Sequence, residues 1–334
     1  MNILTSTSID SDGESLSIED LENMRDAVNG ENALRLGVMH NPIFPPIGQL
    51  YNARLEENED GITLLVADDF KYNETVSEIE GEEYFICTHE KSKSFAGIRR
   101  DSKLDSILLF DYLDFKNEKD KEIFERDLME IHKGLSLGRH IQKAEWNDPQ
   151  VIITLGQYFL FYNILKPIGK AVINKIVEDL GEEFFQQYLK LKNLIVRSVK
   201  EFGSNDKPVI MVIQIPSENV EIELAHKVQL ENIDEYVNSL QPEILKEVSQ
   251  KALYYEELFE AEKIQFVLDD ENKWVLNYLL SSQGKVVGKP KFFNERNKVY
   301  KEILKQDKVG LSYGASSRNI EVESSDKKQN ENGD

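Results

Sequence analysis

The chain has 334 residues, 30% of them charged, and a formal net charge of -21. Such a surface repels phosphate backbones and anionic headgroups, which disfavours direct nucleic-acid binding and docking on acidic membranes. The single cysteine, Cys87, excludes an intrachain disulfide and a zinc site made of several thiolates. Low cysteine use fits a reducing compartment, and we predict a cytoplasmic protein.

The N-terminal part predicts a polar tail followed by a short helix. Residues 1–14 are rich in Ser and Asp and lack the basic and apolar segments of a signal peptide, so we expect a disordered tail. Ser17 and Asp20, three residues apart, approximate a capping box that starts a helix. The apolar residues from Ile18 to Val28 then repeat at helical spacing.

Residues 33–114 carry the period of β-strands. Short apolar or alternating runs are separated by turn-forming residues, and Asp60-Gly61 between two runs is the strongest hairpin signal. We therefore predict an antiparallel meander of five or six strands. Cys87 lies in one run, EYFICTHE, and is predicted to be a small buried side chain rather than a nucleophile.

The loop NPIFPPIG, residues 41–48, contains three prolines between two of these runs. Its apolar side chains could bind a partner, or the loop could be a rigid connector that wraps on the sheet. If it binds a partner, the contact residues are Ile43, Phe44 and Ile47.

A run without charged residues, PQVIITLGQYFLFYNIL, extends from Pro149 to Leu165. Its length is at the lower limit, about 17 residues, for crossing a bilayer. Polar side chains such as Gln157 and Asn163 are costly in a bilayer, and Pro167 disfavours one unbroken helix through position 166. We predict a buried segment at a junction between domains, and membrane association through 149–165 remains an alternative.

The following segment predicts a long amphipathic helix. Between residues 168 and 202 apolar side chains recur every seven residues, and Gly203 is the expected stop. Such a stripe can pack internally or pair two chains. Its candidate contact residues are Phe184, Tyr188 and Ile195.

Beyond residue 204 the pattern is strand, strand, helix, strand, strand, typical of a small α+β domain. VIMVIQI and VEIELAH form the first predicted hairpin, Pro242 splits the helical region, and a second hairpin turns at 269–272. Trp274 is predicted to be a core residue of that second hairpin.

These patterns predict an α+β protein with an N-terminal antiparallel β-rich domain, central long helices and a C-terminal ββαββ-like domain. The predicted parts are a disordered tail over 1–14, a β-rich α+β domain over 15–145, an apolar segment plus long amphipathic helix over 146–204, a small α+β domain over 205–311, and a disordered tail over 312–334.

No phosphate loop, nucleophile elbow or zinc motif occurs, and no two of the five histidines have a metal-ligand spacing. We therefore predict no cofactor and no metal, and we favour a protein without enzymatic activity. The best catalytic pattern is Asp101, Asp114 and Lys116 around the strand-like SILLFDYLDF. Two carboxylates could hold Mg²⁺ while the lysine steadies a water, or these charges could solvate strand ends.

The sequence thus favours a non-enzymatic binding, regulatory or accessory protein that acts through protein–protein contacts, with a partner protein or a second copy. An accessory protein in a bacterial defence or mobile-element setting would fit. The composition, rich in Asn, Lys, Ile and Glu, resembles that of an AT-rich bacterium or its phage. Two alternatives stay open: a membrane-associated effector using 149–165, and a Mg²⁺-dependent nuclease or hydrolase using Asp101–Lys116.

Overall fold

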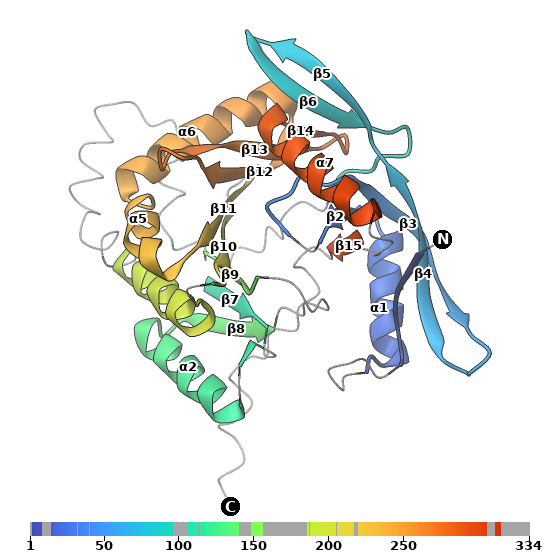
Figure 1. Ribbon diagram of the computed structural model, residues 1–334, viewed down its shortest axis with the longest axis horizontal. Helices are drawn as coiled ribbons and strands as arrows, with labels where there is room; N and C mark the ends of the chain where they lie inside the picture. Colours follow the sequence, from blue (N-terminus) through green and yellow to red (C-terminus); the bar gives the residue numbers. More distant parts are fainter. Residues whose placement is uncertain are drawn as a thin grey trace, which may run out of the picture. The chain divides into compact units, whose positions relative to one another are not determined.

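The structure is a computed structural model, drawn as a ribbon in Figure 1. It describes residues 2–8, 15–31, 33–39, 41–95, 106–111, 114–115, 117–139, 148–155, 186, 188–204, 206–216, 220–305 and 311–314. The chain mixes helices and strands, as the sequence predicts. Parts of both expected disordered tails are strands instead: Asn2–Ser6 of the first tail, and residues 312–314 of the second within Leu311–Gly314. Residues 9–14 and 315–334 lie outside the described residues.

One sheet is antiparallel and has five strands in the order β1-β4-β3-β2-β15. Their bounds are β1 (Asn2–Ser6), β2 (Leu34–Val38), β3 (Gly48–Glu57), β4 (Thr63–Lys71) and β15 (Leu311–Gly314).

Helix α1 (Ile18–Asn29) packs on this sheet as its apolar spacing predicts. The capping box is present, because Ser17 accepts from the Asp20 backbone N–H while the Asp20 carboxylate accepts from the Ser17 N–H. Leu21 and Val28 of the helix belong to the same buried cluster as strand residues of the sheet. The predicted hairpin between β3 and β4 is also confirmed.

The remaining strands belong to a large mixed sheet. Their bounds are β5 (Asn73–Ile79), β6 (Glu82–Thr88), β7 (Ser106–Phe110), β8 (Leu135–Arg139), β9 (Gln150–Thr154), β10 (Val209–Pro216), β11 (Glu221–Val228), β12 (Ala261–Leu268), β13 (Trp274–Ser281) and β14 (Val286–Gly288). Within it, β5-β6-β14-β13 and β11-β10-β9-β7-β8 are runs of neighbours. Only the β9–β10 and β7–β8 pairs in these runs are parallel.

The prediction of one meander over 33–114 is wrong. Strands β2, β3 and β4 do form a meander, but β5 and β6 leave it: β5 pairs with β6, and β6 pairs with β14 from the far end of the chain. β7 pairs instead with β8 and β9. Alternating patterns identify strands but carry no information about which distant strand supplies a partner.

The other described helices are α2 (Glu118–Ile131), the short 3₁₀ helix η2 (Leu230–Asn232), α5 (Ile233–Asn238), α6 (Pro242–Phe259) and α7 (Pro290–Lys305). The break at Pro242 and the β10–β11 hairpin agree with the sequence prediction. Of the predicted long helix, 188–202 is described and helical. The uncharged run begins as β9, and its residues 156–165 lie outside the described part.

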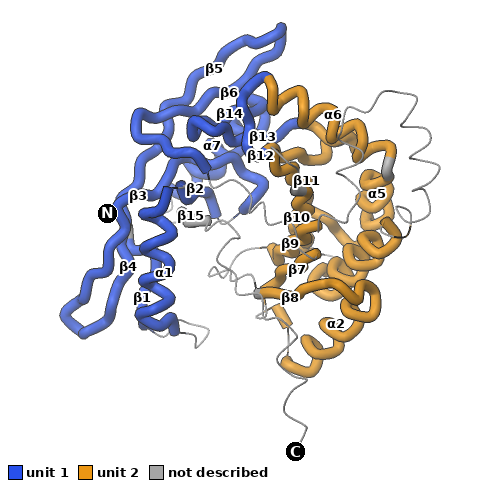
Figure 2. The backbone as a smooth tube through the Cα atoms, turned by 180° about the vertical axis from the view of Figure 1, so that it is seen from behind, with its two compact units in different colours: residues 1–97, 258–263, 276–318 blue, residues 98–257, 264–275, 319–334 orange. Residues whose placement is uncertain are grey.

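The chain forms two compact units, coloured separately in Figure 2. Unit 1 consists of residues 1–97, 258–263 and 276–318, and unit 2 of residues 98–257, 264–275 and 319–334. The sequence patterns predict domain boundaries near residues 145 and 204. The units are instead built from non-contiguous segments, since β14 and α7 return to complete unit 1.

Candidate functional site

The β5–β6 hairpin is a candidate binding surface in unit 1. The two strands pair from Asn73↔Thr88 to Ile79↔Glu82, and Figure 1 shows them running side by side as a long ribbon. Among the described strands β5 has one neighbour, β6, so it is an edge strand. Val76, near the middle of β5, is 54% exposed. An edge strand offers unpaired backbone groups on which another strand can add.

Two like charges face each other across this hairpin. Glu78 of β5 is directly opposite Glu83 of β6, and both side chains are exposed. Like charges in this position destabilise a hairpin. No ion pair between either carboxylate and a cation is found in the part of the chain that the structure describes. The pair therefore offers a negative site beside an exposed valine.

The base of the hairpin is held firmly by α7. Phe85 stacks on Phe293 with the ring centroids 5.3 Å apart. Arg296, whose side chain is completely buried, forms an ion pair with Glu74 of β5. Lys289, which directly precedes α7, pairs with Glu82, the first residue of β6 beside the hairpin turn. The outer edge of β5 is thus presented from a rigid support.

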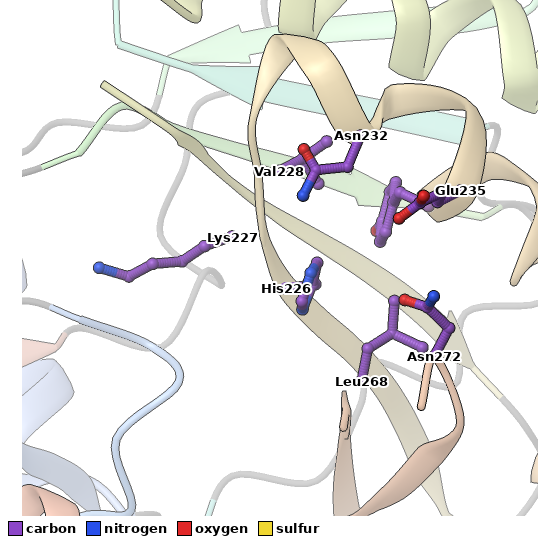
Figure 3. A pocket seen from close by; sticks show the side chains of 8 residues that line it. His226, Lys227, Val228, Asn232, Glu235, Leu268 and Asn272 are labelled. Atoms are coloured by element: carbon purple, nitrogen blue, oxygen red, sulfur yellow. The ribbon is translucent and has the colours of Figure 1, made fainter. Parts of the chain in front are cut away.

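Unit 2 carries a polar pocket beside α5, shown in Figure 3. The hollow is shallow and open to solvent, and only about 20 Å³ of it admits the centre of a water molecule, which is room on the order of one or two waters. It is lined by residues of β11, of η2 and α5, and of the end of β12 with the turn that follows: His226, Lys227, Val228, Asn232, Glu235, Tyr236, Leu268 and Asn272.

Two buried polar atoms of the residues that line this pocket have no hydrogen-bond partner in the described structure. Tyr236 is 2% exposed, and its hydroxyl has no hydrogen-bond partner in the structure. The buried Oδ1 atom of Asn232 also has none. Burial lowers the pKa of His226 to about 4, so its imidazole is neutral at pH 7. Buried polar groups are normally paired, and these two atoms, each with less than 1 Å² of accessible surface, are exceptions within the described structure.

The loop residues predicted as contacts are placed by the structure mainly against the protein itself. Ile47 is 5% exposed and belongs to the unit 1 core. Phe44 packs against the same cluster and Ile43 is half-buried. The loop carbonyls of Pro45 and Pro46 accept hydrogen bonds from Arg296. This environment is that of a connector wrapped on the sheet.

The contact residues predicted on the long helix are only partly described. Phe184 lies outside the described residues. Tyr188 is half-buried, and its hydroxyl donates to the backbone O of Val237 at 3.2 Å. Ile195 is completely buried. These two described side chains make contacts inside unit 2.

Asp101 and Lys116 of the catalytic pattern lie outside the described residues, and Asp114 lies just after β7. Desolvation by nearby protein atoms and the charge of Asp111 raise the pKa of Asp114 to about 6, although its side chain still reaches solvent. Lys207 opposes this rise. Within the described ranges no three His, Cys, Asp or Glu residues are grouped to hold a metal ion.

We expect Asp114→Asn to remove part of the dependence of stability on pH. A raised folded-state pKa means that the stability contributed by protonated Asp114 is present below about pH 4 and lost as the pH rises to about 6. The melting temperature of the variant relative to wild type should therefore increase from pH 4 to pH 7. Thermal unfolding of both proteins from pH 4 to pH 7 tests this prediction. A difference in melting temperature that stays the same at every pH would contradict it.

Cys87 is completely buried in unit 1, and burial raises the pKa of its thiol to about 12. Such a thiol is protonated at neutral pH and is therefore a poor nucleophile. This agrees with the prediction that Cys87 is a small buried side chain. Of the described helices, none has the length and apolar character needed to cross a membrane.

Comparison with known proteins adds no family assignment. No protein-family model, curated protein or solved structure matches this chain.

Proposed function

We propose that the protein is a binding protein that acts through contacts with another protein, and that the partner adds an extended, basic segment to the edge of β5. The observation that carries this proposal is the exposed edge strand bearing Val76 and the unneutralised Glu78–Glu83 pair. Backbone hydrogen bonds would supply affinity, and a lysine or arginine beside the carboxylates would supply specificity.

The charge of β5 favours a different protein over a second copy as the partner. Pairing two β5 strands would bring the acidic side chains of both copies together, which costs free energy. A basic segment gains instead, both from the local carboxylates and from the net charge of -21. We place this partner in the cytoplasm with the protein itself, which low cysteine use supports.

Glu78→Lys separates binding from folding because its two effects have opposite signs. It converts a repulsive cross-strand pair into an attractive one, so the free energy of unfolding should rise by about 0.2–1 kcal/mol. It also repels a basic partner segment, so binding should fall. Denaturant unfolding gives the first quantity, and photo-crosslinking in cells from position 76 gives the second.

The matched control is Glu59→Lys, the same charge reversal at an exposed position of the β3–β4 turn in unit 1. It should leave the adduct formed at position 76 unchanged. A crosslinker at the exposed Leu304 of α7 should not give the same adduct. Equal adduct yields from wild type and Glu78→Lys would refute the proposed surface.

A further inference from the structure

The turn of the β5–β6 hairpin determines which backbone groups of β5 face its free edge. Ile79 is directly opposite Glu82, and the two residues between them, Glu80 and Gly81, have φ angles of 51° and 80°. Two loop residues with positive φ form a type I′ turn, in which the residues that flank the loop are a hydrogen-bonded pair. Hydrogen-bonded and non-hydrogen-bonded pairs then alternate along the hairpin.

Three residues of β5 direct their backbone groups outward. Counted from the turn, the non-hydrogen-bonded pairs are Glu78 with Glu83, Val76 with Phe85 and Glu74 with Cys87. In such pairs the backbone N–H and C=O groups point away from the facing strand, so those of Glu74, Val76 and Glu78 point away from β6. Among the described strands only β6 pairs with β5, so these backbone groups are available to an added strand.

The side chains of these three residues lie on one face of β5 and differ in chemistry, since residues two apart in a strand share a face. Glu74 is already matched in charge, because it forms an ion pair with Arg296. Val76 is 54% exposed. Glu78 is exposed, faces Glu83 and has no ion pair with a cation among the described residues. The edge therefore has an acidic end and a neutralised end, with an apolar residue between them.

An antiparallel orientation of the added strand is favoured. Antiparallel pairs are slightly more stable per residue than parallel ones, and the β5–β6, β6–β14 and β14–β13 pairs are all antiparallel. An antiparallel strand meets Glu78 first, Val76 two residues later and Glu74 two residues after that. A basic side chain gains most at the first of these positions, because at the last one Arg296 already pairs with the carboxylate.

We propose that the partner segment is an antiparallel strand in which a lysine or arginine precedes a β-branched aliphatic residue by two positions. This inference rests on the proposed function, and it adds the orientation and the order of the side chains that the β5 edge selects. The basic residue lies beside Glu78 and Glu83, and the aliphatic residue lies beside Val76. The residue between them points to the other face, beside the half-buried Ser77, and can be polar.

The test uses the full-length protein and two acetylated and amidated peptides of identical composition. One is Thr-Lys-Thr-Val-Thr-Ser-Thr, and the other is its reverse, Thr-Ser-Thr-Val-Thr-Lys-Thr. NMR titrations that follow the methyl groups of Val76 give the two dissociation constants. We expect the first peptide to bind about two- to fivefold more tightly, which is the effect of one exposed ion pair. Because the peptides have equal charge, the difference reports the order of the residues alone.

Two variants show whether Glu78 causes this preference. Glu78→Lys should remove it, so that both peptides bind equally, whereas Glu59→Lys should preserve it. Equal affinities for the wild-type protein, tighter binding of the reversed peptide, or no saturable shift with either peptide would each overturn the proposed order. A preference that persists in Glu78→Lys would overturn it as well.

The photo-crosslinking experiment at position 76 tests the proposed function separately. If the adduct forms in cells and is lost in Glu78→Lys, but the peptides show no preference, the β5 surface stands and only the proposed order fails. If no adduct forms from position 76, the surface itself fails.

Discussion

Arg296→Ala is expected to lower the free energy of unfolding of unit 1 by about 3–5 kcal/mol. The Arg296 guanidinium is completely buried and donates to the carbonyl of Pro46 at 2.8 Å and to that of Pro45 at 3.3 Å. It also forms the ion pair with Glu74. Alanine would leave a carboxylate and two carbonyls without their donor, together with a cavity under the proline loop.

Arg296→Lys is the matched control for this effect. Lysine keeps the positive charge but cannot bridge the loop carbonyls and Glu74 at once, because it lacks the planar array of donors. We expect Arg296→Lys to lower the free energy of unfolding, but by less than Arg296→Ala does. Denaturant unfolding of both variants and of the wild type measures these losses. A loss below about 1 kcal/mol for Arg296→Ala would show that the loop does not depend on this side chain.

Trp274→Ala should have a similarly large effect on unit 2, about 3–5 kcal/mol. Trp274 is 1% exposed, and its indole N–H donates to the Ser239 carbonyl at 2.8 Å. Its ring also supports Tyr236 edge-on. Removing it leaves a large cavity between the hairpin and the end of α5, and the Ser239 carbonyl loses its donor.

Trp274→Phe separates the two contributions to this effect. Phenylalanine fills most of the volume but has no N–H group, so we expect a loss of about 1–3 kcal/mol from the unpaired carbonyl. Thermal or denaturant unfolding of both variants provides the comparison. Equal losses for alanine and phenylalanine would mean that packing of the ring contributes little.

Local features of the fold could be predicted from the sequence. The Ser17–Asp20 capping box, the Asp60-Gly61 hairpin and the helix start at Pro242 are each encoded by a few neighbouring residues. The burial of Trp274 was also predicted, because an alternating strand flanked by turn residues places it on the inner face. In these cases propensity and pattern act over short distances.

Features that depend on distant segments could not be predicted. The pairing of β6 with β14 joins residues about two hundred positions apart, and no local pattern announces it. In the sequence, Arg296 occupies a polar position of an amphipathic helix, which predicts exposure to solvent. Its burial is possible because the loop carbonyls and Glu74 accept its hydrogen bonds.

The candidate sites show the same limit. His226, Asn232 and Asn272 come from three elements, and only their packing places them around one hollow. The acidic side chains of the β5–β6 hairpin were visible in the sequence, but the edge position of β5 was not. No short motif identifies either site, because neither depends on a fixed spacing.

The measurement that tests the central claim most directly combines two readings on Glu78→Lys. The first is the free energy of unfolding, and the second is the yield of the adduct formed from a photo-crosslinker at position 76 in cells. We predict that stability rises while the adduct disappears, with both unchanged in Glu59→Lys. An adduct that persists at the wild-type yield in Glu78→Lys would contradict protein binding at the β5 edge.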